Sequence, residues 1–259
     1  MDGGLLTLTI FCVGYVAQLT YGTLGIGFGV FSASLLIFLG FYPATVSASV
    51  HVAKVFVSLI SGGSHLRLGN VQRELATPLS IFGMFGGICG ACLLSYISGA
   101  LVRPAVAALL LLIGVRIILR FARTPRRTNN SPASRYGLSF RRASLLGFVA
   151  AFVDGVGGGG WGPIATASMM LSDVEPRKAV GSVNLAGFFV SVVISLTFLL
   201  TLGAQGFPWQ VIVALLAGGA LAAPLAALLC KKLPHRTLGT LVGVALVGVN
   251  MKTILPYLL

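Results

Sequence analysis

The sequence predicts an all-α polytopic membrane protein. Of its 259 residues, 56% are hydrophobic and only 9% are charged, whereas a soluble domain carries about 25% charged residues. Apolar runs that approach the length of a membrane-spanning helix, about 20 residues, recur along the whole chain. A soluble fold with an apolar core is excluded, because no polar face would remain to meet water.

The apolar segments are expected near residues 4–22, 28–41, 43–62, 76–98, 101–120, 143–155, 161–172, 176–202, 209–230 and 236–256. The stretch between the fifth and sixth segments, 120–142, is rich in Arg and contains Pro, Ser and Asn without apolar periodicity. It predicts a linker between two membrane halves, residues 1–119 and 143–259.

The net charge of +13 lies mostly in short stretches between apolar runs, so it indicates membrane topology and no nucleic-acid partner. The linker holds seven arginines and is therefore expected in the cytoplasm of a bacterial inner-membrane protein. The basic loops 65–74, 173–178 and 231–236 then fall on the same side, and both termini lie outside. The opening, MDGGLLTLTIF, lacks the basic region of a cleaved signal peptide.

The two halves match in a gapless register that aligns residue 22 with residue 155. This register aligns SVHVA (49–53) with SVNLA (182–186). It also places Gly22, Gly25, Gly27 and Gly29 on Gly155, Gly158, Gly160 and Gly162. Because the first half starts outside and the second inside, we expect an inverted repeat of two five-segment units. Each unit would be a glycine-turned helical hairpin plus three transmembrane helices.

The glycines of YGTLGIGFGV (21–30) and DGVGGGGWGP (154–163) are expected to form the hairpin turns. At about 1.5 Å per residue, the segments 143–155 and 161–172 are each too short for a hydrocarbon core of about 30 Å. Glycine accepts positive φ and allows close approach of a ligand. The helix N-termini that follow near Phe28 and Trp161 would present free N–H groups to an anion. Alternatively, the glycines only allow tight helix packing. The candidate binding residues here are Gly25, Gly27, Phe28, Gly158, Gly160 and Trp161.

Polar residues at mid-depth supply further candidates. His51 and Lys54 share one helical face with Ser47 in the segment 43–62. Lys54 would contact the substrate anion or pair with Asp154, and His51 would serve the site or pack in the core. Asp154 is the proton-coupling candidate, or a turn-forming residue. Three more residues complete the expected binding set: Ser49, its second-half equivalent Ser182, and Asn184, which is the equivalent of His51.

No motif in the sequence supports an enzyme. A Ser/His/Asp grouping, an H-E-x-x-H pattern and a phosphate-binding loop are all missing from the sequence. Cys89 and Cys92 have the spacing of a metal pair but no second pair or histidine nearby, so we expect them to be packing residues. No catalytic residue, metal or cofactor is expected.

Several stretches in order resemble the TauE/SafE family of sulfite and organosulfonate exporters, also called the 4-toluenesulfonate uptake permease family. They are GTLGIGFGVFSASLLIFLGFYPATVSASVHVAK, RLGNV (67–71), GVGGGGWGPIATASMML and EPRKAVGSVNLAG. The family's glycine turn with a following proline corresponds to Gly158, Gly159, Gly160 and Pro163. The first half lacks this proline. The choice of His51 and Lys54 as site residues does not come from the family and rests only on their expected depth in the membrane.

The resemblance implies a bacterial inner-membrane carrier of small sulfur-containing anions. We therefore expect a proton-coupled secondary transporter of sulfite, thiosulfate or an organosulfonate that works by alternating access. A transporter of another small anion such as a carboxylate, and a passive anion channel, are the alternatives. The expected partners are the anion and the lipid bilayer, and a homodimer is left open.

Overall fold

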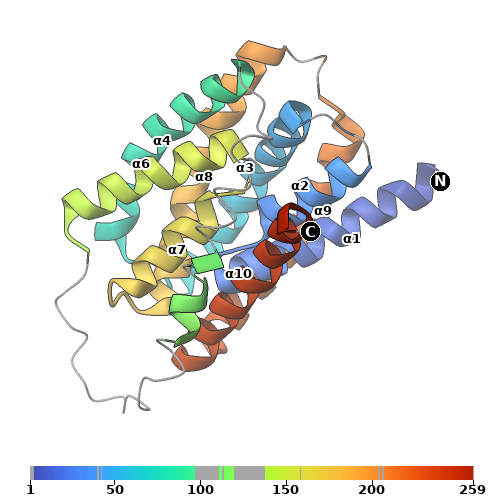
Figure 1. Ribbon diagram of the computed structural model, residues 1–259. Coiled ribbons are helices and arrows are strands. Elements are labelled where there is room, and N and C mark those ends of the chain that lie inside the picture. Colours follow the sequence, from blue (N-terminus) through green and yellow to red (C-terminus); the bar gives the residue numbers. More distant parts are fainter. Residues whose placement is uncertain are drawn as a thin grey trace.

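The computed structural model describes residues 3–39, 41, 43–96, 111–112, 114–119, 138–157, 159–203, 205 and 207–258. Within these ranges the chain is helical and contains no strand (Figure 1). The helices are α1 (Gly3–Leu24), α2 (Phe28–Phe38), α3 (Pro43–Arg67), α4 (Arg73–Tyr96), α6 (Phe140–Gly157), α7 (Trp161–Leu171), α8 (Pro176–Leu202), α9 (Trp209–Lys232) and α10 (His235–Leu258).

Several of these helices are long and apolar enough to cross a membrane. By length and composition they are Gly3–Leu24, Thr45–Arg67, Arg73–Ser95, Pro176–Leu202 and Trp209–Lys232. In contrast, α2 and α7 have 11 residues each. A helix of that length covers about 16 Å, roughly half of the hydrocarbon core. The predicted all-helical architecture and the short arms α2 and α7 are therefore confirmed, whereas α6, with 18 residues, is longer than the short arm expected over 143–155.

Both glycine-rich stretches break a helix, but their backbones differ. Between α1 and α2, Gly25 has φ 78° and Gly27 has φ 128°, which side chains rarely tolerate. Between α6 and α7, Gly160 has φ −85° and lies in the right-handed region. A Cβ on Gly160 would lie 2.7 Å from Cγ1 of Val153, so this glycine is needed for space rather than for positive φ. Gly158 lies outside the described residues.

The long helices pack in matching pairs. α1 packs against α9 as α6 packs against α4, and α3 packs against α9 as α8 packs against α4. α3 and α8 pack against each other, and α4 and α6 lie side by side in Figure 1. In the α1–α9 and α4–α6 pairs the two backbones are in close contact. A Cβ added to Gly14 would lie 2.5 Å from the Leu215 carbonyl oxygen, and one added to Gly147 would lie 2.8 Å from the Leu79 carbonyl oxygen. Small residues permit such contact between membrane helices.

Several helices extend past the apolar segments expected from the sequence, and α6 and α3 do so through polar residues. α6 begins at Phe140 rather than at residue 143, with the exposed Arg141 and Arg142 in its first turn. α3 continues to Arg67 rather than ending at residue 62. Its polar last turn is helical, and His65 in that turn is fully buried. Of the segment 101–120, only residues 111–112 and 114–119 are described, and the linker up to residue 137 lies outside the described residues.

Candidate functional site

A buried carboxylate joins α6 to α3. Asp154 lies near the end of α6 and is 1% exposed. Its Oδ2 atom lies 3.1 Å from Nε2 of His51 and 3.1 Å from Nζ of Lys54. Both basic side chains come from the middle of α3 and are almost fully buried. Lys54 therefore pairs with Asp154, which is one of the two roles expected for it.

The contacts of His51 fix where its ring carries a proton. Nδ1 lies 2.8 Å from the carbonyl oxygen of Ser47, which can only accept, so Nδ1 carries a hydrogen. A second proton must then lie between Nε2 and the Asp154 carboxyl group. It makes His51 an imidazolium or it makes Asp154 a neutral acid. With Lys54 charged, the cluster carries one net positive charge in either case.

Asp154 also meets the start of α7. The backbone N–H of Trp161 interacts with its carboxylate, and the N-cap residue Gly160 supplies no side-chain cap. A carboxylate is favourable there because the N-terminus of a helix carries partial positive charge. The α7 N-terminus, expected to be bare, thus has an anion of the protein itself before it.

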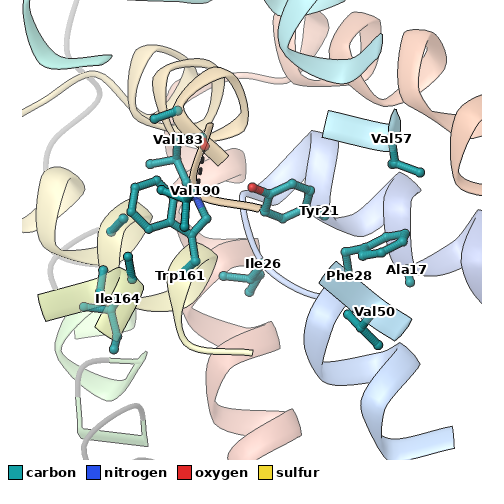
Figure 2. Close-up of a cluster of buried hydrophobic side chains, with 14 of the residues drawn as sticks. Ala17, Tyr21, Ile26, Phe28, Val50, Val57, Trp161, Ile164, Val183 and Val190 are labelled. Carbon is teal, nitrogen blue, oxygen red and sulfur yellow. Dashed lines mark hydrogen bonds between the residues drawn. The ribbon is translucent and has the colours of Figure 1, made fainter. Parts of the chain in front are cut away.

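Tyr21 and Trp161 enclose the cluster from α1 and α7. Lys54 Nζ lies 5.5 Å from the centre of the Tyr21 ring, a cation–π distance. The Trp161 indole donates to the carbonyl oxygen of Val183 at 3.1 Å, and Tyr21 lies beside it in Figure 2. Gly187 leaves room for both rings, since a Cβ there would lie 2.7 Å from the Tyr21 hydroxyl oxygen and 3.0 Å from the Trp161 indole nitrogen.

The gapless register of the sequence pairs these residues across the two halves. Tyr21 matches Asp154, and Gly187 matches Lys54. The Lys54–Asp154 ion pair joins the first half to the second, and the register matches it to Gly187 and Tyr21. The matched positions therefore differ in charge, because only the first pair is ionic.

The two helix breaks touch each other. The carbonyl oxygen of Gly25 accepts a hydrogen bond of 3.2 Å from Thr166 of α7. A Cβ on Gly162 would collide with the same carbonyl group, and a Cβ on Gly159 would lie 3.0 Å from Val30 of α2. The expected convergence of the two breaks is present, and close packing is one reason for their glycines.

The remaining candidates lie around this centre with other partners. Asn184 donates to the carbonyl oxygens of Tyr21 at 3.3 Å and Val180 at 3.0 Å. Ser49 donates to the carbonyl oxygen of Thr45 at 2.7 Å, within its own helix. Ser182 accepts from the backbone N–H of Gln72 at 2.9 Å, in the connection between α3 and α4. Gly27 and Phe28 lie at the first break, where Phe28 is fully buried.

Tyr21 and the second half of α3 were not among the expected site residues. A tyrosine in an apolar run carries little signal, although its match to Asp154 in the repeat register could have found it. On α3, the spacing that joins Ser47, His51 and Lys54 continues to Ser58, Ser61 and His65. All three are fully buried.

The cysteines form no metal or disulfide site in the described part of the chain. Cys89 is an exposed free thiol and Cys92 is half-buried. The described residues contain no group of three His, Cys, Asp or Glu side chains placed to hold a metal ion.

Comparison with known proteins identifies relatives of the whole chain. The family described as "Sulfite exporter TauE/SafE" matches residues 10–253. The chain is 37% identical over 247 residues to "Probable membrane transporter protein YtnM" of Bacillus subtilis (strain 168), covering 94% of this chain and 81% of that protein. It is 29% identical over 185 residues to "Probable membrane transporter protein YdhB" of the same organism, covering 70% and 72%. No solved structure gives a significant match. The chain belongs to the TauE/SafE sulfite exporter family of membrane transporters.

Proposed function

We propose that the protein is a secondary transporter that carries a small sulfur-containing anion across the bacterial inner membrane together with a proton. Sulfite, thiosulfate and organosulfonates are the substrate class. The observation that carries the proposal is the convergence of Lys54, His51 and the Trp161 N–H on one buried carboxylate. A cation, an imidazole and a helix N-terminus are the groups that bind an oxyanion.

Asp154 acts in this proposal as an internal competitor of the substrate. Its carboxylate occupies the donors that a transported anion would need. Protonation of Asp154 weakens its hold on Lys54 and frees these donors. The addition of one proton and one monoanion leaves the net charge of the buried cluster unchanged, so the two bind together at the lowest electrostatic cost. They therefore move in the same direction.

Alternating access is supported by the exchange symmetry of the helix pairs. Swapping the halves 1–119 and 143–259 turns the α1–α9 pair into α6–α4 and leaves α3–α8 unchanged. Two halves of inverted topology can exchange conformations and open one central site to opposite sides. In this proposal the linker 120–142 is cytoplasmic and both termini are outside.

Counterflow in proteoliposomes tests the function. Vesicles loaded with unlabelled sulfite receive labelled sulfite outside, with and without an imposed pH gradient, and with thiosulfate, taurine, a carboxylate or chloride as competitors. The expected result is saturable exchange that sulfur oxyanions inhibit and that a pH gradient makes concentrative. Inhibition by the carboxylate alone would change the substrate class to carboxylates, and flux that never saturates would identify a passive channel.

A further inference from the structure

The polar face of α3 does not end at Lys54. Buried polar residues recur at helical spacing along the whole helix: Ser47, His51, Lys54, Ser58, Ser61 and His65, each at most 3% exposed. At about 1.5 Å per residue, this face runs for about 27 Å, nearly the thickness of the hydrocarbon core. A membrane helix that buries polar side chains over this length has a partner for them other than lipid.

The partner side chains of the second half of this face come mainly from α1. The Tyr21 hydroxyl faces the Ser58 hydroxyl. One turn further along, a Cβ on Gly22 would lie 3.0 Å from the Gln18 amide nitrogen and 3.4 Å from the Ser61 hydroxyl oxygen. The His65 ring faces the backbone of the same Gly22. The polar row, here Gln18, Tyr21, Ser58, Ser61 and His65, is therefore continuous from Lys54 to the last turn of α3.

Most of the polar row lacks a well-formed hydrogen bond. Both amide atoms of Gln18 are buried without one. The Tyr21 and Ser58 hydroxyls and Nε2 of His65 make no well-formed hydrogen bond, although each faces a polar group nearby. The Ser61 hydroxyl, in contrast, donates to the side-chain oxygen of Asn184 at 2.7 Å. Unpaired polar atoms are costly to bury, and ordered water or a polar ligand is their usual partner.

The orientation of His65 follows from its neighbours. The Asn70 side-chain nitrogen donates to the carbonyl oxygen of Ala227 at 3.0 Å, which fixes the amide orientation. The same nitrogen lies 3.1 Å from Nδ1 of His65, so Nδ1 must accept and Nε2 carries the hydrogen. This N–H faces the backbone of Gly22 and has no side-chain partner. Asn70 thus holds His65 as a neutral donor.

The polar row is suited to an anion. Its members are neutral, each supplies at least one hydrogen-bond donor, and none is a carboxylate. Lys54 contributes positive charge at one end. The hydroxyl and amide oxygens of the row can also accept, so the preference for an anion comes from the positive charge of Lys54 and from donors on two helices without a carboxylate among them.

We propose that the polar row is a water-accessible anion pathway that connects the Lys54–Asp154 cluster with the C-terminal end of α3. It rests on the proposed transport function and adds the residues that lead the anion to and from the central site. The neutral donors replace part of the hydration shell of the anion without holding it tightly, which passage requires.

Cysteine accessibility tests the pathway. In a folded variant whose four cysteines are replaced, Ser58→Cys and Ser61→Cys are exposed to thiol reagents of opposite charge. These are anionic sulfonatoethyl and cationic trimethylammonioethyl methanethiosulfonate. The matched control is Val57→Cys on the same helix, since Val57 is fully buried in the apolar core. The expected result is that both serine positions react at least about tenfold faster than Val57, with the anionic reagent preferred.

The other outcomes overturn the pathway without touching the central site. Serine positions as unreactive as Val57→Cys would show that the row is dry. Equal reaction with both reagents would show water access without anion preference. Wild-type protein that fails counterflow while the cysteines react as expected would instead contradict the transport function.

A second variant separates passage from structure. Gln18→Leu keeps the side-chain size and removes both unpaired amide atoms. We expect stability to be kept or raised, because an unsatisfied buried amide is lost, and the exchange rate to fall several-fold. An unchanged exchange rate in the folded variant would exclude Gln18 from the pathway.

Discussion

Asp154 and Lys54 show at the residue scale how this chain keeps charges inside an apolar bundle. Each is at most 4% exposed through its side chain. Removing one member of a buried ion pair leaves an uncompensated charge, whereas replacing both can be nearly neutral. The pair is therefore best examined through single and double substitution.

Lys54→Met is expected to lower the free energy of unfolding by about 3 kcal/mol, because Asp154 loses one of its two buried basic partners and keeps only the contact with His51. The double variant Lys54→Met/Asp154→Asn should recover most of this loss, while both variants bind the anion poorly. Thermal unfolding in detergent and counterflow measure the two effects. A double variant no more stable than the single one would contradict the pairing.

Gly187→Ala tests whether the Tyr21 and Trp161 side chains need the space that the missing Cβ of Gly187 leaves. Its Cβ would meet the Tyr21 hydroxyl and the Trp161 indole nitrogen, so we expect a loss of about 1–3 kcal/mol from overpacking. Gly63→Ala is the matched control, since no atom lies within 4 Å of the added Cβ. The control should be neutral or slightly stabilising. Equal thermal stability of the two variants would rule out the crowding.

At the scale of elements, the broken helices combine arms that are too short to span the membrane with breaks that are buried in the bundle. α2 and α7 are too short to span the membrane, and glycine occupies the break before each. Gly25 combines two demands: positive φ and contact with Thr166. These demands can be separated by substitution.

Gly25→Ala is expected to destabilise the protein by several kcal/mol, because it adds backbone strain and a collision with Thr166. Gly69→Ala carries only the strain, since Gly69 has φ 71° and open space around its Cβ, and should cost about 1–2 kcal/mol. Denaturation of both variants compares the two contributions. Equal losses would mean that Thr166 yields to the added methyl group.

The sequence predicted the elements well wherever apolar content decided them. The short arms and their breaks were predictable because glycine density and arm length are local properties. The last turn of α3 was not predictable, because the burial of His65 depends on other parts of the chain. These are Gly22, which is distant in sequence, and Asn70, which lies in the loop after α3. Likewise, the backbone of Gly160 depends on Val153 across the break. Side-chain partners such as His51 and Asp154 require the tertiary structure.

At the scale of the whole molecule, Asp154→Asn is expected to separate transport from the proton gradient. The amide mimics the protonated acid and carries no charge, so anion exchange should persist while a pH gradient no longer concentrates the substrate. Counterflow with and without the gradient measures both. Exchange that is still concentrative would remove Asp154 from the coupling mechanism.

The proposed topology can be checked by labelling from one side. Ser134→Cys in the linker should react with a membrane-impermeant thiol reagent only when the cytoplasmic face is exposed, in a background without other cysteines. A tag before Gly3 should be accessible from the opposite side. Labelling of the linker from the outside would invert the arrangement.

The unequal halves bear on the resting state of the proposed carrier. Exchange between identical halves would give two end states of the same energy, and the empty protein would divide evenly between them. Here Lys54 and Asp154 are matched by Gly187 and Tyr21, and only the first pair is charged. The two end states then differ in energy by the strength of the Lys54–Asp154 contact between the halves, because the matched positions Gly187 and Tyr21 form no ion pair. In the proposed mechanism the empty carrier would therefore favour one orientation, and its affinity measured from the two sides of the membrane would differ.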